Sequence, residues 1–131
     1  MDCVTLGDSI ATGLTKLLMC EQRAYVGASS DKIIKLAKGS YRVQCIISAG
    51  SNDPYNPALS INLHQIRRNA FCNAYVWVIP ANGASHSVRQ VANFYRDVTV
   101  TFVPGKDGVH PASYNELAKR IMANNFEQRP N

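Results

Sequence analysis

The stretch Val4-Thr-Leu-Gly-Asp-Ser9-Ile-Ala-Thr-Gly13 organises this chain, because an apolar strand runs through it into a Gly-Asp-Ser turn. A helix is predicted to begin directly after the turn, since apolar residues recur at helical spacing from Ile10 to Leu18. A turn of this kind presents the Ser9 hydroxyl at the carboxyl edge of a sheet. It also directs the first N–H groups of a helix toward whatever that hydroxyl attacks. Ser9 is therefore a candidate nucleophile.

Strand-like and helix-like segments alternate along the remaining sequence. The predicted strands cover residues 2–6, 23–26, 42–48, 74–79 and 98–103. The helices that follow are predicted to begin at Ile10, after the Ser29–Asp31 cap, at Pro57, near Ser85 and at Pro111. Five strands alternating with five helices predict an α/β fold, a five-stranded parallel sheet covered by helices on both faces. The 131 residues fit one domain, 1–131, with residues 124–131 expected to form a frayed polar tail.

Three polar stretches follow predicted strands at the point where each strand ends. They are residues 7–9, 50–53 and 107–110, after the first, third and fifth strands. Because ligands of parallel sheets bind beyond the carboxyl ends of the strands, we expect these stretches to meet at one edge. This agreement between three separate loops is the main argument from the residues for a functional site.

The residue types in these loops are those that acyl transfer requires. A serine hydroxyl becomes a good nucleophile only when a base takes its proton, and His110 is the candidate base. Asp107, three residues earlier, is placed to hold the imidazole in the required tautomer. A tetrahedral intermediate also needs hydrogen-bond donors, and the candidates are the backbone N–H groups of Ser9 and Gly27 and the side-chain amide of Asn52.

These residues resemble the four conserved blocks of the SGNH (GDSL-type) hydrolase superfamily, and they occur in the family's order. The blocks are Gly7-Asp8-Ser9-Ile10, Gly27, Gly50-Ser-Asn52-Asp53 and Asp107-Gly-Val-His110. The resemblance covers nearly the whole chain. It implies a three-layer α/β/α fold of flavodoxin-like type, Ser9, Asp107 and His110 as catalytic residues, an oxyanion hole from Ser9, Gly27 and Asn52, and no metal or other cofactor.

The family includes lipases, thioesterases and carbohydrate O-acetyl esterases. The resemblance therefore predicts a serine esterase that forms an acyl-enzyme. Two features depart from the family pattern: Ile10 replaces a leucine, and the chain is shorter than typical members, so the loops around the pocket are reduced. We therefore expect a small acyl ester as substrate, an O-acetyl group on a carbohydrate being the best guess. Whether a second subunit completes the pocket stays open.

Composition excludes several other classes of function. The formal net charge of +5 is compatible with an anionic partner, but the basic residues are scattered, with Arg67-Arg68 as the one adjacent pair of arginines, so nucleic-acid binding is not expected. The longest apolar runs are far shorter than the ~20 residues of a membrane-spanning helix. Neither GxGxxG nor GxxxxGK[ST] follows a strand, which argues against a nucleotide-binding domain.

The four cysteines show neither a CxxC pair nor zinc-ligand spacing. They are predicted to be free structural thiols in a reducing compartment, a redox or metal role being the alternative. No signal peptide is visible at the N-terminus, so cytoplasmic synthesis is expected.

Each candidate residue also has a purely structural interpretation. Asp8 and Ser9 are favoured helix caps, and Asn52 and Asp53 are favoured turn residues. For Asp8 and Asp53 we expect the structural role, a loop brace and a turn, and for Asn52 and His110 the functional one. The competing hypothesis for the whole protein is a catalytically silent domain of the same fold that binds carbohydrate or serves a structural role.

Overall fold

The computed structural model describes residues 2–127, and over this range it confirms the predicted α/β fold. The strands are β1 (Cys3–Gly7), β2 (Glu21–Ala24), β3 (Tyr41–Ser48), β4 (Phe71–Val78) and β5 (Val98–Val100). The helices are α1 (Ser9–Leu18), α2 (Ser30–Ala37), α3 (Leu59–Asn69), α4 (Ser85–Tyr95) and α5 (Tyr114–Glu127). All strand pairs are parallel, in the order β2-β1-β3-β4-β5.

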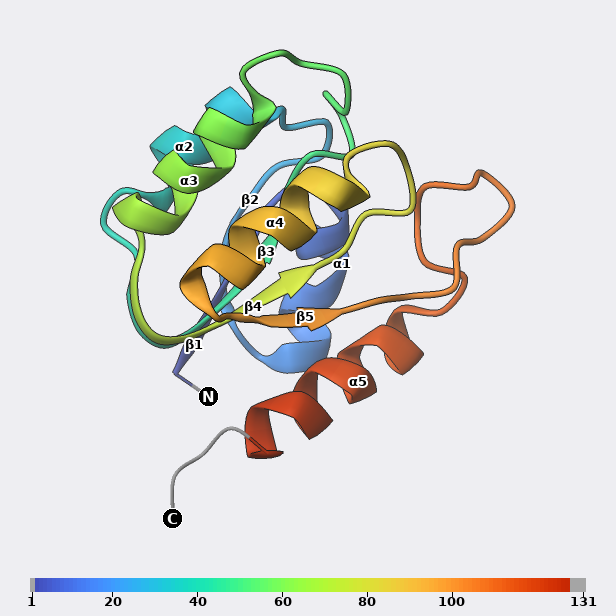
Figure 1. The fold of residues 1–131 in the computed structure, drawn as a ribbon. Helices are drawn as coiled ribbons and strands as arrows, with labels where there is room; N and C mark the ends of the chain where they lie inside the picture. The colour runs from blue at the N-terminus through green and yellow to red at the C-terminus, as the bar shows by residue number, and fades with distance from the viewer. Residues whose placement is uncertain (1, 128–131) are drawn as a thin grey trace.

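The sheet is the middle of three layers, as in flavodoxin-like folds (Figure 1). Helices α2, α3 and α4 pack on one face against Val4, Leu6, Ile47 and Trp77. Helices α1 and α5 pack on the other face, where alternate strand residues such as Ile46 contribute. Because successive side chains of a strand point to opposite faces, the apolar runs of β3 and β4 supply both cores at once. Among the described residues, no helix is long and apolar enough to cross a membrane.

The chain reverses direction across the sheet next to β1. It passes from β1 outward to the edge strand β2, then returns to β3 on the other side of β1. Such a switch point leaves a crevice beyond the carboxyl ends of the two central strands. The loops that follow β1 and β3 therefore flank this crevice.

Several predicted boundaries are displaced by a few residues. Strand β2 covers Glu21–Ala24 instead of 23–26, because Val26 and Gly27 form a turn. Strand β4 starts earlier than predicted, at Phe71, where it pairs with Tyr41 of β3. Strand β5 ends at Val100 instead of residue 103, since its neighbour β4 ends at Val78 and offers no further partner.

Helices α3 and α5 illustrate how proline can precede a helix without starting it. Helix α3 begins at Leu59, two residues after Pro57. Pro111 instead forms an antiparallel bridge with Pro104, and α5 begins at Tyr114 after Ser113, whose hydroxyl accepts a hydrogen bond from the Glu116 N–H. Helix α5 continues to Glu127 and so includes residues 124–127 of the predicted tail, while residues 128–131 lie outside the described range.

The prediction of free cysteines is wrong. Cys3 is bonded to Cys20 and Cys45 to Cys72, and the described residues contain no free thiol. Cys20 lies directly before β2, whose Glu21 pairs with Val4, so the parallel register brings Cys20 beside Cys3. Register between strands is not visible in cysteine spacing, and the sequence therefore gave no sign of these bonds. The argument for a reducing compartment loses its support, because disulfides persist in oxidising environments.

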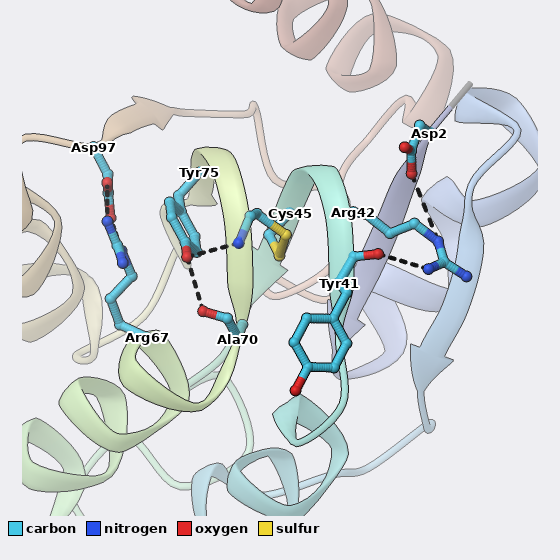
Figure 2. Close-up of a disulfide and its surroundings, with 9 residues drawn as sticks. Asp2, Tyr41, Arg42, Cys45, Arg67, Ala70, Tyr75 and Asp97 are labelled. Carbon is cyan, nitrogen blue, oxygen red and sulfur yellow. Dashed lines mark hydrogen bonds and ion pairs between the residues drawn. A yellow bond between two sulfur atoms is a disulfide. The ribbon is translucent and has the colours of Figure 1, made fainter.

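The second disulfide belongs to a dense group of contacts near the start of β4 (Figure 2). The Tyr75 hydroxyl accepts a hydrogen bond from the Cys72 N–H and donates one to the Ala70 carbonyl. Arg67 lies over the Tyr75 ring, 3.4 Å from its centroid, and forms two hydrogen bonds with the Asp97 carboxylate. This end of the sheet is therefore held by covalent and ionic links.

Candidate active site

Ser9, His110 and Asp107 form one hydrogen-bonded chain. The Ser9 hydroxyl lies 2.7 Å from His110 Nε2, and His110 Nδ1 lies 2.6 Å from Asp107 Oδ2. With the imidazole proton on Nδ1, that nitrogen donates to the carboxylate and Nε2 accepts from the Ser9 hydroxyl. The fold thus brings together two residues that are 101 positions apart in the sequence. This is the arrangement of nucleophile, base and orienting carboxylate that acyl transfer uses.

The Ser9 corner owes its shape to close packing between β1 and β3. Gly7 has φ +145°, and a Cβ there would lie 1.8 Å from the Ser48 carbonyl oxygen. The Asp8 N–H donates to that same carbonyl, so the turn is bonded to the end of β3. Asp8 is the N-cap of α1 and accepts from the Ile10 N–H. Capping by Asp8 leaves the neighbouring Ser9 hydroxyl available to His110.

Asp8 is the loop brace that the sequence predicted, and it is fully buried. Its carboxylate accepts hydrogen bonds from the Ser48 and Ser51 hydroxyls at 2.8 and 2.6 Å. Burial raises the pKa of Asp8, and the hydrogen bonds from Ser51, Ser48 and the first N–H groups of α1 oppose that rise. The brace ties the nucleophile corner to the loop that carries Asn52.

Asp107 is held as an anion by its own loop. The N–H groups of Val109 and His110 both donate to its Oδ1 at 2.9 Å. These contacts and the His110 imidazole lower the pKa of Asp107 to about 2, the Val109 N–H contributing most. The carboxylate therefore stays ionised down to acidic pH, and as an anion it can orient the imidazole.

The three predicted oxyanion donors lie in three segments, which follow β1, β2 and β3 and are joined to one another by hydrogen bonds. The Asn52 side-chain amide donates to the Ala28 carbonyl at 2.9 Å, next to Gly27. The Tyr25 N–H donates to the Gly7 carbonyl, which ties the Gly27 turn to the nucleophile corner. Among the described residues, no hydrogen bond is donated by the backbone N–H of Ser9 or Gly27. Gly27 has φ +82° and open space where a Cβ would stand, so its conformation, and not crowding, calls for glycine.

Asp53 has a structural position, as the sequence predicted, but with a different partner. It accepts hydrogen bonds from the N–H and the hydroxyl of Ser30, at the first residue of α2, and from the Asn56 side chain. It thus stabilises the start of α2 in place of bonding its own turn alone. Its neighbour Asn52 is exposed.

The hydrogen-bonded chain of Ser9, His110 and Asp107 is open to solvent. The side chain of His110 is 43 % exposed and that of Asp107 is 54 % exposed, whereas such carboxylates are normally buried. A cavity of about 600 Å³ lies at the other end of the sheet, lined by residues that include Arg67, Tyr75 and Arg96, and touches none of the three. The side chains of His110 and Asp107 are therefore accessible to solvent, and this cavity is not part of the candidate site.

Three residues around the site were not predicted from the sequence. Ser48 and Ser51 are partners of Asp8, and their position at the end of the third strand and in the loop after it was the available signal. Tyr114 lies shortly after Pro111, and no local pattern marks it as part of the site. Its ring lies against Gly13 of α1, and the negative charges of Asp8 and Asp107 act on its hydroxyl.

No protein-family model matches this sequence, and neither a curated protein nor a solved structure matches it. The resemblance to SGNH hydrolases therefore rests on the four sequence blocks. The interpretation of the site rests on the distances between its own side chains.

Proposed function

We propose that this protein is a serine esterase of the SGNH type, which hydrolyses a small acyl ester through an acyl-enzyme. The observation that carries the proposal is the pair of short hydrogen bonds from Ser9 to His110 and from His110 to Asp107. Their partners come from loops after β1 and β5, at opposite sides of the sheet centre. A serine that served only as a helix cap would have no need of a base, and the cap position is already filled by Asp8.

In the first half of the reaction, Ser9 Oγ attacks the ester carbonyl carbon while its proton passes to His110 Nε2. The new O–C bond converts the carbonyl oxygen into an oxyanion, which the N–H groups of Ser9 and Gly27 and the Asn52 amide are proposed to bind. His110, now an imidazolium beside the Asp107 carboxylate, gives its proton to the departing alkoxide. The ester C–O bond breaks, and the alcohol leaves an acyl group on Ser9.

In the second half, a water molecule takes the place of the alcohol. His110 removes one proton from the water, and the resulting hydroxide attacks the acyl carbon. The proton then returns to Ser9 Oγ as the acyl–enzyme bond breaks, and the carboxylic acid is released. Because the pKa of Asp107 is lowered to about 2, we expect the Asp107 carboxylate to stay ionised and able to orient the imidazole until the pH approaches that value.

The substrate we favour is an O-acetyl group on a carbohydrate. The exposure of the catalytic residues supports a short acyl group on a large alcohol, since the surface offers little lining for a long acyl chain. An open surface admits a polymer without threading it into a pocket. Turnover of an eight-carbon ester much faster than acetate would contradict the acetyl assignment.

The same exposure favours a second candidate, a carbohydrate-binding or structural module with a silent site. The hydrogen-bonded relay of Ser9, His110 and Asp107 is in contact with water, and such a relay stabilises the charges of a transition state less than a buried one. Under this hypothesis, glycan binding would survive Ser9→Ala and the parent protein would turn over no ester.

The proposal is tested by labelling the folded protein with a fluorophosphonate probe and locating the adduct by mass spectrometry. We expect a covalent label on Ser9 in the parent protein and none in Ser9→Ala or His110→Ala. Ser85→Ala is a matched control, since Ser85 also begins a helix but lies on α4. No label on the folded parent protein would overturn the esterase proposal and lead to the binding assay above.

A further inference from the structure

Gly13 occupies an unfavourable place for glycine, in the middle of α1. Glycine inside a helix is less favourable than alanine because it loses more backbone freedom on folding, and nothing in the backbone here demands it, since the φ of Gly13 is not positive. The reason is a neighbour on α5. A Cβ at position 13 would lie 2.3 Å from Cε1 and 2.6 Å from Cζ of the Tyr114 ring. Because Gly13 has no side chain, the Tyr114 ring can pack directly against the surface of α1, and we call this place at Gly13 the seat of Tyr114.

This seat is the direct neighbour of the catalytic contact. Gly13 lies four residues after Ser9 on α1, so the two share one helix face one turn apart. Tyr114 likewise lies four residues after His110. The Ser9–His110 hydrogen bond and the Gly13–Tyr114 contact are therefore two successive points at which the segment after β5 meets α1.

The loop that carries His110 is otherwise held mainly by bonds within itself. The Gly105 N–H donates to the His110 carbonyl, the Ala112 N–H donates to the Val103 carbonyl, and Pro104 pairs with Pro111. Such a loop behaves as one unit whose position is set at its base. Figure 1 shows it in orange, between β5 and α5, and Tyr114 begins the helix at that base.

We propose that Tyr114, seated on Gly13, is a positioning residue that fixes the distance between the His110 imidazole and the Ser9 hydroxyl. The proposal rests on the proposed function, because it assigns a role within that site. The ring acts by its bulk, as a spacer between α1 and the base of the loop. The hydroxyl is not required for this role.

The surroundings of Tyr114 agree with this position. Its side chain is half-buried, and burial together with the charges of Asp8 and Asp107 raises its pKa. The neutral Tyr114 side chain therefore lies close enough to both Asp8 and Asp107 for their charges to act on it.

The test compares four variants with the parent protein on a small acetate ester. Tyr114→Phe keeps the ring and should retain activity within about twofold. Tyr114→Ala and Gly13→Ala, which remove or displace the ring, should each lower kcat about tenfold or more with little change in KM, because small misplacements of a catalytic group are costly. In the double variant Gly13→Ala/Tyr114→Ala, the added methyl should cause no further loss, since the ring it would displace is absent.

Gly83→Ala is a matched control. Gly83 also faces a tyrosine ring, that of Tyr55, with a Cβ 3.0 Å from it, but this pair lies outside the relay. Its kcat should stay within about twofold of the parent.

An NMR measurement that needs no ester turnover tests the positioning role of Tyr114 independently of the proposed esterase activity. In protein with ¹⁵N-labelled histidine, Ser9→Ala should shift the His110 Nε2 resonance, because it removes the hydrogen bond. Tyr114→Ala should shift it toward the Ser9→Ala position, while Tyr114→Phe and Gly83→Ala should leave it unchanged.

The outcomes are distinct. An inactive parent protein overturns the proposed function, and the resonance then still decides the positioning role. A parent-like resonance in Tyr114→Ala, or equal losses in Tyr114→Phe and Tyr114→Ala, would overturn the positioning proposal. Additive losses in the double variant would do the same.

Discussion

The two ends of the parallel sheet are built in different ways. At the carboxyl ends, loops are joined by hydrogen bonds through Asp8, Asn52 and Asp53, and the relay of His110 and Asp107 is open to water. At the amino ends, three of the four cysteines lie at or before the first residues of strands, and an ion pair of Arg67 with Asp97 adds to the disulfides. Strong links are thus concentrated away from the candidate site, which leaves its loops free to be specialised for chemistry.

If this separation holds, changes at one end should alter activity and changes at the other should alter stability. The largest effect is expected for Ser9→Ala and His110→Ala. Each should lower kcat/KM on a small acetate ester by about 10³-fold or more, and the midpoint of urea unfolding should stay near that of the parent protein. A parallel measurement of hydrolysis and of unfolding by circular dichroism checks this. A large loss of stability in either variant would contradict the separation of the two ends.

Asp97→Ala should have the next largest effect, now on stability. Asp97 is 5 % exposed, pairs with Arg67 and accepts a hydrogen bond from the Trp77 indole N–H. Its removal leaves a largely buried guanidinium and a buried indole N–H without their acceptor, at a cost of about 3–5 kcal/mol in the free energy of unfolding.

Denaturant titration measures this cost. Asp31→Ala is a suitable control, because Asp31 is an exposed helix residue at the start of α2. Equal destabilisation by the two substitutions would show that the Arg67–Asp97 pair contributes no more to the free energy of unfolding than an exposed carboxylate does.

Removal of the Cys45–Cys72 disulfide is expected to have a smaller effect. The bond closes a segment of 27 residues, so Cys45→Ala/Cys72→Ala should lower the free energy of unfolding by about 3 kcal/mol. Ester hydrolysis at 25 °C should be unchanged while the protein is folded. Thermal unfolding with and without reductant measures the effect. If reductant leaves the melting temperature of the parent protein unchanged, the prediction is contradicted.

The smallest effect concerns the pH dependence of stability. Burial raises the pKa of Asp8 above its ordinary value of 3.8, so the folded protein holds this proton more tightly than the unfolded chain. The stability contributed by protonated Asp8 is complete below the unfolded pKa and is lost as the pH rises through the folded pKa.

Asp8→Asn should therefore reduce the decline in the free energy of unfolding as the pH is raised through the range above the ordinary carboxyl pKa of 3.8. Urea titrations of parent and variant across that range provide the measurement. An identical slope in both proteins would contradict the assignment of this proton to Asp8.

The sequence alone determined the order of elements, the parallel sheet and the location of the polar loops at its carboxyl edge. These features follow from local patterns: strand-length apolar runs such as 74–79, helical spacing after Ser9, and loop-forming residues after each strand. Of the structural roles, those of Asp8 and Asp53 were also predicted from their positions in turns.

Only the tertiary structure decided which distant residues meet. The Cys3–Cys20 and Cys45–Cys72 bonds, the partners of Asp8 and the Tyr114 seat on Gly13 all depend on strand register and on how helices lie against each other. Neither is encoded in a local pattern, because a shift of one strand or a small rotation of one helix changes every such contact while leaving the pattern of apolar residues intact.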